Sequence, residues 1–285
     1  MTPPGVPRVV IAGNLTLDDV VEADGHVELG VAGGNALYGA LGARRWSASV
    51  GIVTRAGEDA PAAALAAAGA AGVDLGGVVR VPGPTVRCWV LYEADGGRAF
   101  VSRTPPARYD EVVLRPDDVP DAWLDAAAFH IAATRLDAAE ALVARVRSRG
   151  ARIVLDTHED HVGDADRVLA LARQVDVFCP SREELAELAG EDAPERSAPA
   201  FAGGTGTPVV AKLGADGCLV ALPDGRAWRL ASVADDVVDP TGAGDAFCGG
   251  VAAALAEGLD VLEAARRGSA SAALAAGARG SAGFA

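Results

Sequence analysis

The residues best suited to chemistry lie in one stretch near the C-terminus, VVDPTGAGDAFCGG, at residues 237–250. Gly242 and Gly244 bracket a tight turn, which lets backbone N–H groups come close to a ligand. We expect residues 237–238 to form a short apolar strand and an apolar helix to open at Asp245. The unpaired N–H groups and the positive end of the helix dipole would then form an anion site suited to phosphate.

Asp245 adds a carboxylate beside this predicted anion site. A carboxylate there is suited to act as general base for a hydroxyl nucleophile, while the N–H groups of Gly242, Ala243 and Gly244 stabilise charge on a transferred phosphoryl group. The same carboxylate at the first helical position is also an ordinary helix cap. The turn is neither GxGxxG nor GxxxxGK[ST], so the residues alone leave both interpretations open.

Length and charge exclude several classes of function. The chain has 285 residues and a net charge of −14, so it has room for one large α/β domain or two small ones. An acidic chain lacks the basic face that nucleic acids and anionic membranes demand, so we expect neither as a partner. The N-terminus has no signal-peptide pattern and the four cysteines form no CxxC pair, which predicts a soluble cytoplasmic protein.

The order of the predicted elements indicates the fold class. Short apolar runs alternate with helical patterns along most of the chain, as in an α/β protein with a doubly wound, mostly parallel sheet. Two β-rich hairpins interrupt this order, at about residues 15–30 and 85–104. We expect a single domain over residues 1–285, with the hairpins projecting from it. Ligands of such sheets bind at the carboxyl ends of the strands, where we expect Asp156.

The stretch DPTGAGDAFCGG resembles the signature of the ribokinase-like, or PfkB, family of carbohydrate kinases, usually written D-T-x-G-A-G-D-x-F. Further stretches follow the family's order over essentially the whole chain, namely GNLTLDD, AGGNALYGALGA, VGIVTRAGED, CPSREELAEL and VVAKLGADGCLV. The resemblance implies transfer of the γ-phosphoryl group of ATP to a hydroxyl, with Mg²⁺ as cofactor and Asp245 as general base. It also implies that the hairpins form a small β-strand lid over the acceptor.

The resemblance assigns further site residues, position by position. The acceptor would be held by Asn14, Asp18, Gly33, Gly34 and Asn35. The nucleotide would lie along Lys212, Gly214, Gly217, Ser181 and Glu184, with Glu184 acting on Mg²⁺ through water. Asp239 and Thr241 match positions that help to hold a monovalent cation, such as K⁺, in some relatives.

Structural roles are also open for several of these residues when they are considered alone. Asp18 could be a solvated residue of a strand, and Lys212 could be a surface lysine. Asn35 could cap a helix, and Ser181 with Glu184 could form a capping box. Tyr38 offers a stacking surface for a base, although packing of a core-facing helix explains it as well.

The acceptor is the main alternative within the family. A small sugar is the first choice, a nucleoside the second and a cyclitol the third. Asn35 stands where ribokinase itself has lysine, which disfavours free ribose. An alternative from a different class of function is a sensor that has the same fold and binds a sugar or nucleotide without catalysis. An exposed edge of the lid would allow two copies to pair as a homodimer.

Overall fold

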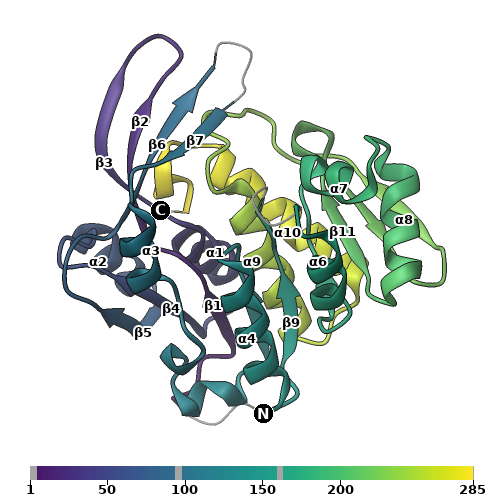
Figure 1. Cartoon of the computed structure of the whole chain (residues 1–285). Helices are drawn as coiled ribbons and strands as arrows, with labels where there is room; N and C mark the ends of the chain where they lie inside the picture. The colour runs from purple at the N-terminus through teal and green to yellow at the C-terminus, as the bar shows by residue number, and fades with distance from the viewer. Residues whose placement is uncertain (1–4, 94–97, 159–162, 285) are drawn as a thin grey trace.

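The computed structural model describes residues 5–93, 98–158 and 163–284, which form two sheets and the helices around them (Figure 1). The large sheet has nine strands in the order β13-β12-β11-β10-β9-β8-β1-β4-β5. They are β1 (Val9–Ala12), β4 (Val50–Ala56), β5 (Val73–Arg80), β8 (Ala128–Ile131), β9 (Arg152–Leu155), β10 (Val177–Phe178), β11 (Val209–Lys212), β12 (Cys218–Ala221) and β13 (Ala227–Leu230). Every neighbouring pair from β5 to β11 is parallel, which confirms the predicted fold class.

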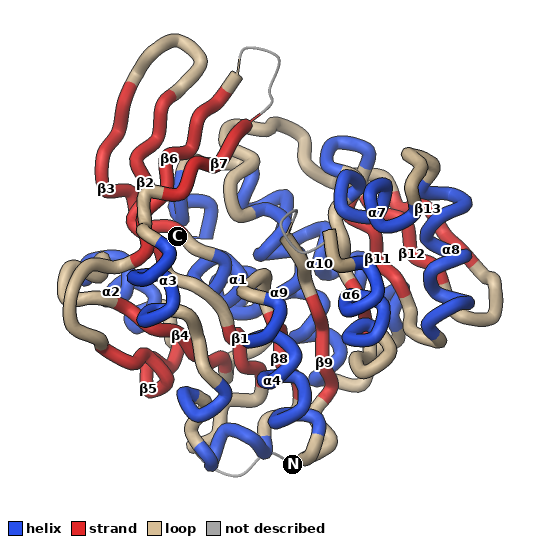
Figure 2. Tube along the Cα trace, in the orientation of Figure 1, coloured by secondary structure: helices blue, strands red, loops and turns tan. Residues whose placement is uncertain are grey.

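Helices cover both faces of the large sheet (Figure 2). One face packs against α1 (Asn35–Arg44), α2 (Ala62–Ala70), α9 (Ala243–Ala256) and α10 (Val261–Ala276). The other packs against α4 (Leu136–Arg147), α6 (Ala165–Ala172), α7 (Arg182–Ala189) and α8 (Pro194–Thr205). Parallel strands covered on both faces need continuous apolar runs, and β1 is accordingly buried at all four positions.

The helix that carries Asp245 is held very close to a neighbouring helix. A Cβ atom added to Gly249 on α9 would lie 2.0 Å from the carbonyl oxygen of Gly39 on α1. Only glycine allows this approach, so the backbones of α1 and α9 contact directly. The N-terminus of α9 is therefore fixed by packing at the start of the candidate site.

A second, four-stranded sheet projects from the large one at the top of Figure 1. It contains β2 (Thr16–Val21), β3 (Val27–Gly33), β6 (Val86–Tyr92) and β7 (Arg98–Ser102), in the order β3-β2-β6-β7. Asp18 pairs with Cys88, and Val20 with Val90, so these side chains share one face of the sheet. We call this sheet the small sheet; its role as a lid stays a prediction.

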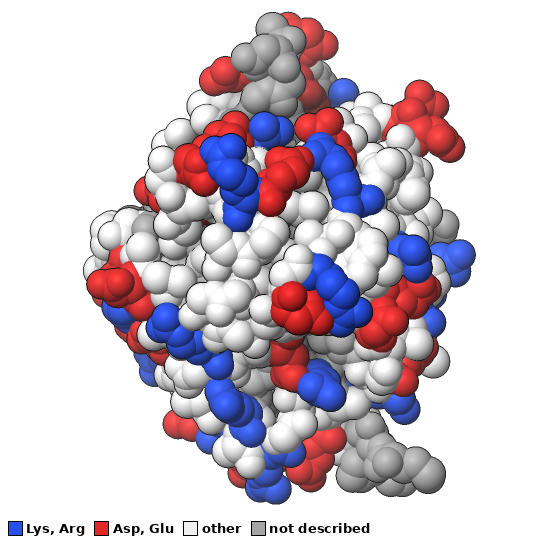
Figure 3. Space-filling model, turned by 90° about the vertical axis from the view of Figure 1, so that its right-hand side faces the viewer, with Lys and Arg blue, Asp and Glu red and all other residues white. Residues whose placement is uncertain are grey.

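The surface bears on the predicted partners. None of the helices in the described ranges is both long and apolar enough to span a membrane. Figure 3 shows acidic and basic side chains side by side on one face of the molecule. The edge strands of the small sheet expose Leu29 by 68% and Val101 by 48%. Pairing of two copies at these edges stays a prediction.

Candidate active site

The parallel strands bring polar residues together at one edge of the large sheet. Asn14 lies just beyond β1, Asp156 directly follows β9, Ser181 lies just beyond β10, and Lys212 ends β11. Since the carboxyl ends of parallel strands meet at the same edge, residues far apart in the sequence become neighbours. The expected place of Asp156 at the carboxyl end of its strand is thereby confirmed.

The glycine turn at the start of α9 differs from the sequence prediction in two details. The helix begins at Ala243, two positions before Asp245, and its N-cap is Gly242, with φ 73° and no side-chain cap. Asp245 therefore lies inside the first helical turn and does not cap the helix. A Cβ atom on Gly242 would lie 2.2 Å from the Tyr38 ring, so the turn requires glycine for its backbone angle and for space.

The predicted apolar strand before this turn is wrong. Val237 and Val238 lie in a loop and are 59% and 55% exposed. The N–H groups of Val238 and Asp239 both bond to the carbonyl oxygen of Ala276, at 2.8 and 3.1 Å. A single carbonyl at a helix end provides no strand with which to pair, so the segment stays irregular.

Asp239 organises the turn through its carboxylate. Oδ1 accepts from the Tyr92 hydroxyl at 2.6 Å and from the Thr241 N–H at 2.9 Å, and Oδ2 accepts from the Gly280 N–H at 3.2 Å. Burial raises the pKa of Asp239, but these hydrogen bonds outweigh it and leave that pKa below its usual range. Binding of a monovalent cation by Asp239 and Thr241 stays a prediction.

Of the three turn amides predicted to bind phosphate, one already has a partner within the turn. The Ala243 N–H donates to the carbonyl oxygen of Pro240 at 3.2 Å. The N–H groups of Gly242 and Gly244 lie on either side of it at the helix start, where intrahelical acceptors are lacking. Gly242 and Gly244 are thus the better donors for an anion.

Asn14 and Asn35 form one wall of the predicted acceptor site. Asn35 Oδ1 accepts from the Asn14 N–H at 2.7 Å, and its Nδ2 donates to the Ala133 carbonyl oxygen at 2.7 Å. Asn35 was expected to be able to cap α1, but the cap is Gly34, with φ 101°. The Asn35 side chain instead joins the ends of β1 and β8, and Asn14 Nδ2 donates to the same Ala133 oxygen at 3.2 Å.

Asp18 is the most unusual group in this region. It is only 8% exposed, Thr16 donates to its Oδ2 at 2.9 Å, and its Oδ1 is buried without a hydrogen-bond partner. Burial raises the pKa of Asp18 to about 6. A Cβ atom on Gly33 would lie 2.1 Å from Oδ2, so this glycine gives the carboxylate its space. A solvated strand position for Asp18 is excluded.

Tyr38 connects the acceptor side of the site with the catalytic turn. Burial, followed by the charges of Asp239, Asp245 and Asp18, raises the pKa of its hydroxyl. The three carboxylates come from separate stretches of the sequence, and the charge of each acts on the pKa of this one phenol. Tyr38 is 2% exposed under the glycine turn, so it packs there and is not available to stack on a base.

Lys212 lies on the nucleotide side and is not a surface lysine. Its Nζ is 2.6 Å from Asp156 Oδ1, and the two side chains are 15% and 4% exposed. Burial alone would lower the pKa of Lys212, but the charges of Asp156, Cys248 and Glu184 outweigh it and raise that pKa. A Cβ atom on Gly244 would lie 3.6 Å from this Nζ, so the ammonium lies beside the glycine turn.

Ser181 and Glu184 form the predicted capping box of α7. Glu184 Oε2 accepts from the Ser181 N–H at 2.9 Å and from the Thr157 hydroxyl at 2.8 Å. Burial raises the pKa of Glu184. Carboxylate oxygens are the donors that Mg²⁺ prefers, and Mg²⁺ commonly keeps its water ligands. Both hydrogen bonds use Oε2 of Glu184, so Oε1 could accept from a water ligand of a Mg²⁺ ion.

Gly214 and Gly217 lie in the connection between β11 and β12. Gly214 has φ 59° and Gly217 has φ 84°. A Cβ atom on Gly217 would lie 2.0 Å from the Leu230 carbonyl oxygen, so the backbone passes very close to β13. The structure places both glycines next to Lys212, at the carboxyl end of β11.

The sequence analysis placed Asp156 in this region but missed its neighbours His130 and Cys248. His130, Asp156 and Cys248 are buried together, with ligand atoms within 4.8 Å of one another. The Lys212 ammonium already supplies the positive charge at this cluster, which disfavours a metal ion there. Tyr92 was also missed, although the alternation of β6 places it on the same face as Cys88 and Val90 and could have indicated it.

Comparisons with known proteins agree with this geometry. The model of the pfkB family carbohydrate kinases matches residues 14–284. A cytidine kinase of Thermococcus kodakarensis is 29% identical over 91% of this chain and 92% of its own. An ATP-dependent ribose-1-phosphate kinase of Halopiger xanaduensis is 30% identical over 96% of this chain and 93% of its own.

A solved structure from E. coli shares the fold. That chain, in complex with ATP and Mg²⁺, is 24% identical and superposes with a TM-score of 0.79, covering 96% of this chain and 94% of its own. The arrangement of a mostly parallel large sheet with a small second sheet is therefore shared across the whole molecule.

Proposed function

The chain belongs to the pfkB family of carbohydrate kinases, enzymes that transfer a phosphoryl group to a hydroxyl, and we propose that its own acceptor is a neutral nucleoside, with ATP as donor and Mg²⁺ as cofactor. At the coarser level it is a sugar or nucleoside kinase. The proposal concerns the class of acceptor and the roles of the individual residues.

The buried carboxylate of Asp18 carries the proposal. A buried polar oxygen without a partner costs free energy, and sites of this kind are retained where a ligand supplies the missing donor. A carboxylate accepts hydrogen bonds from two adjacent hydroxyls, which a ribose ring presents. Both curated relatives described above act on ribosyl compounds, which supports a ribose unit in the acceptor.

The charges around the small sheet favour a neutral acceptor over a sugar phosphate. A phosphate on the acceptor would need an available cation, yet three of the arginines described on and beside this sheet are ion-paired. The pairs are Arg87 with Asp59, Arg103 with Asp19, and Arg135 with Asp110 and Asp137. On the face that carries Asp18, the buried Val90 pairs with the 50% exposed Phe100, whose ring offers an apolar surface suited to a nucleobase.

In the proposed reaction, the oxygen of the acceptor hydroxyl attacks the γ-phosphorus of ATP, and ADP leaves. Asp245 accepts the proton of that hydroxyl. The N–H groups of Gly242 and Gly244 donate to the transferred phosphoryl oxygens, and Ala243 contributes through the helix dipole. The nucleotide lies along Lys212, Gly214, Gly217 and Ser181. Glu184 would hold Mg²⁺ through water, and the bound ion neutralises phosphate charge.

The test is an ADP-release assay with Mg-ATP and a panel of cytidine, uridine, adenosine, ribose, ribose-1-phosphate and a cyclitol, in K⁺ and in Na⁺ buffers. We expect turnover on at least one nucleoside and a kcat/KM for ribose-1-phosphate at least about 100-fold lower, because each unpaired buried charge costs several kcal/mol. A preference for ribose-1-phosphate contradicts the neutral acceptor. ATP binding without turnover on any acceptor indicates the sensor alternative.

Lys212 offers a separate prediction for the nucleotide side. It is the single lysine of the sequence, so an acyl-phosphate derivative of ATP should label the chain there and nowhere else among side chains. We expect Lys212→Met to lower kcat/KM for ATP at least about tenfold, since it removes a charge that pairs with phosphate. It should also lower the free energy of unfolding by about 3 kcal/mol, because Asp156 is left buried and unpaired.

The double variant Lys212→Met/Asp156→Asn separates the two effects. With both charges removed, the free energy of unfolding should return to within about 1 kcal/mol of wild type. If Lys212 binds phosphate, kcat/KM for ATP stays low in the double variant. Recovery of kcat/KM together with stability contradicts a phosphate role and makes Lys212 purely structural.

A further inference from the structure

Among the described residues, the Tyr92 side chain joins the small sheet to the catalytic turn. Tyr92 is the last residue of β6, and its hydroxyl donates to Asp239 Oδ1 at 2.6 Å and also contacts the Thr241 hydroxyl. The same Oδ1 accepts the Thr241 N–H at 2.9 Å. One carboxylate oxygen is thus shared between a strand of the small sheet and the turn that leads into α9.

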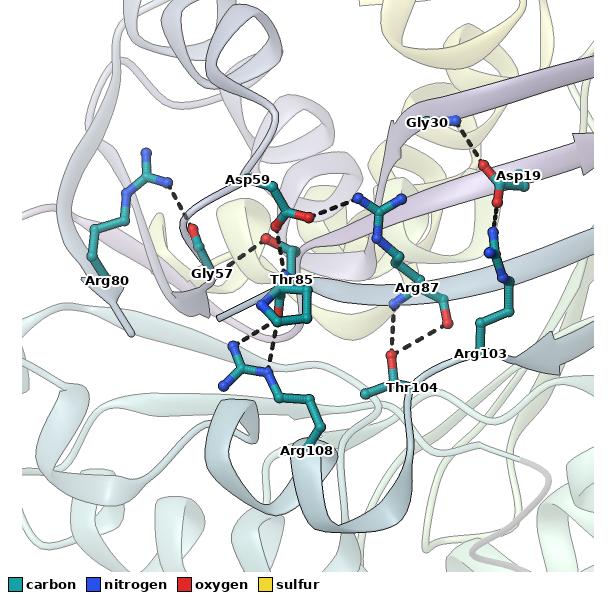
Figure 4. A network of polar contacts seen from close by, with 11 residues as sticks. Asp19, Gly30, Gly57, Asp59, Arg80, Thr85, Arg87, Arg103, Thr104 and Arg108 are labelled. Carbon is teal, nitrogen blue, oxygen red and sulfur yellow. Dashed lines mark hydrogen bonds and ion pairs between the residues drawn. The ribbon is translucent and has the colours of Figure 1, made fainter. Parts of the chain in front are cut away.

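The base of the small sheet is anchored independently of this contact. The Arg87 guanidinium pairs with Asp59 at 2.7 Å, and Asp59 also accepts the Thr85 N–H at 2.6 Å (Figure 4). Arg108 donates to the Pro84 carbonyl oxygen at 2.6 Å, which fixes the start of β6 against α3 (Pro106–Val112). Since the base is held by these contacts, the far end of β6 is where the sheet meets the turn.

A second contact ties the same two regions near the C-terminus. Gly280 donates its N–H to Asp239 Oδ2 at 3.2 Å, and the neighbouring Arg279 pairs with Glu22, which directly follows β2, at 3.2 Å. Asp239 is therefore the point where the far ends of β2 and β6 both act on the turn. Asp239 also remains ionised, since its hydrogen bonds keep its pKa below the usual range, as described above.

We propose that Tyr92 is a positioning residue that couples closure of the small sheet to the order of the catalytic turn. The proposal rests on the proposed kinase function, because the turn matters for phosphoryl transfer. With the sheet closed, the Tyr92 hydroxyl fixes Asp239 and Thr241, and through them the glycine backbone and the start of the helix that carries Asp245. With the sheet lifted, the shared oxygen loses this donor and the turn loosens.

The test is Tyr92→Phe, which keeps the ring and removes only the hydroxyl. A hydrogen bond to a charged group changes a local equilibrium by about tenfold or more. We expect kcat to fall about tenfold, with the acceptor KM changed less than about threefold, because the hydroxyl that is removed bonds to the turn. Unchanged kcat contradicts the proposal, as does a loss confined to KM.

A second measurement does not depend on catalysis. Hydrogen exchange of the nucleotide-free protein should become about tenfold faster at the amides of residues 239 and 241–244 in Tyr92→Phe, because the turn opens more often. Leu91→Ala is the matched control: Leu91 pairs with Val21 on the opposite face of the same strand, so exchange in the turn should stay as in wild type. Equal exchange in wild type and Tyr92→Phe overturns the coupling.

Failure of the coupling and failure of the kinase proposal are distinguishable. A wild-type chain without turnover on any acceptor contradicts the kinase proposal, whereas the exchange result still decides whether Tyr92 orders the turn. The double variant Tyr92→Phe/Thr241→Val adds a further check. If the Tyr92 hydroxyl acts through this turn, adding Tyr92→Phe to Thr241→Val should accelerate exchange less than Tyr92→Phe accelerates it in the wild-type chain. Fully additive effects contradict a shared contact.

Discussion

Asp245→Asn should bind ATP as the wild type does and lose about 10²- to 10⁴-fold in kcat, because a positioned general base is removed from the reaction. Asparagine keeps the shape of the side chain but does not accept a proton at neutral pH. Asp245 lies in the first turn of α9, so the loss of its charge costs only about 0.3–1 kcal/mol of helix stabilisation. The measurements are steady-state kinetics and ATP binding by calorimetry on the same preparation.

Asp260→Asn provides a matched control for this variant. Asp260 is also a carboxylate at a helix start, where it caps α10 by accepting the Glu263 N–H at 2.9 Å, but it lies at the far end of α9 from the glycine turn. We expect a modest change in stability and wild-type kcat. A near-normal kcat in Asp245→Asn contradicts its role as base. An equal loss in both variants indicates that helix stability, not proton transfer, limits the rate.

The fold could be predicted because its signals are local. Each buried strand is a short apolar run, and the capping box of Ser181 and Glu184 shows in a spacing of three residues. The prediction that ligands bind at the carboxyl edge, where Asp156 lies, followed from the parallel order alone. A general rule of sheet geometry was sufficient there, without any knowledge of side-chain contacts.

The details that were wrong depend on neighbours distant in sequence. Residues 237–238 have a strand-like composition, but the structure gives them only the end of α10 as a partner. Asparagine is a residue type typical of helix caps, yet the amide of Asn35 bonds to backbone groups just beyond β1 and β8. The alternation of β6 shows which face Tyr92 occupies, but its contact with Asp239 spans 147 residues, so no local pattern indicates that partner. Such choices are decided by tertiary packing.

Asp18→Asn is the second variant with a large expected effect, on acceptor binding and on stability together. We expect kcat/KM for the acceptor to fall about 100-fold, since a charged partner of the substrate hydroxyls is lost. The free energy of unfolding at pH 8 should rise, by up to about 2 kcal/mol. A buried amide costs less than a buried carboxylate whose Oδ1 lacks a partner.

The sign of the pH effect on stability follows from the direction of the shift. Burial raises the pKa of Asp18 from 3.8 to about 6 in the folded chain, so the folded state binds this proton more tightly than the unfolded state. Ionisation of Asp18 therefore destabilises the fold above about pH 6, and this cost disappears as the pH falls from 6 to 4. The stability gained by Asp18→Asn should shrink over the same window, as thermal unfolding at several pH values will show.

Acceptor binding should have the opposite pH dependence, because the ionised carboxylate is the form that accepts hydroxyl hydrogen bonds. We expect kcat/KM for the acceptor to fall below a midpoint near pH 6, and this acid limb to be absent in Asp18→Asn. Asp19→Asn is the matched control, since Asp19 is the next residue on β2, points to the opposite face and pairs there with Arg103. The limb should persist in that variant. If the acid limb persists in Asp18→Asn, another group titrates and Asp18 is not the acceptor ligand. If the acid limb is lost in both variants, the substitutions have disturbed the strand and not only the carboxylate.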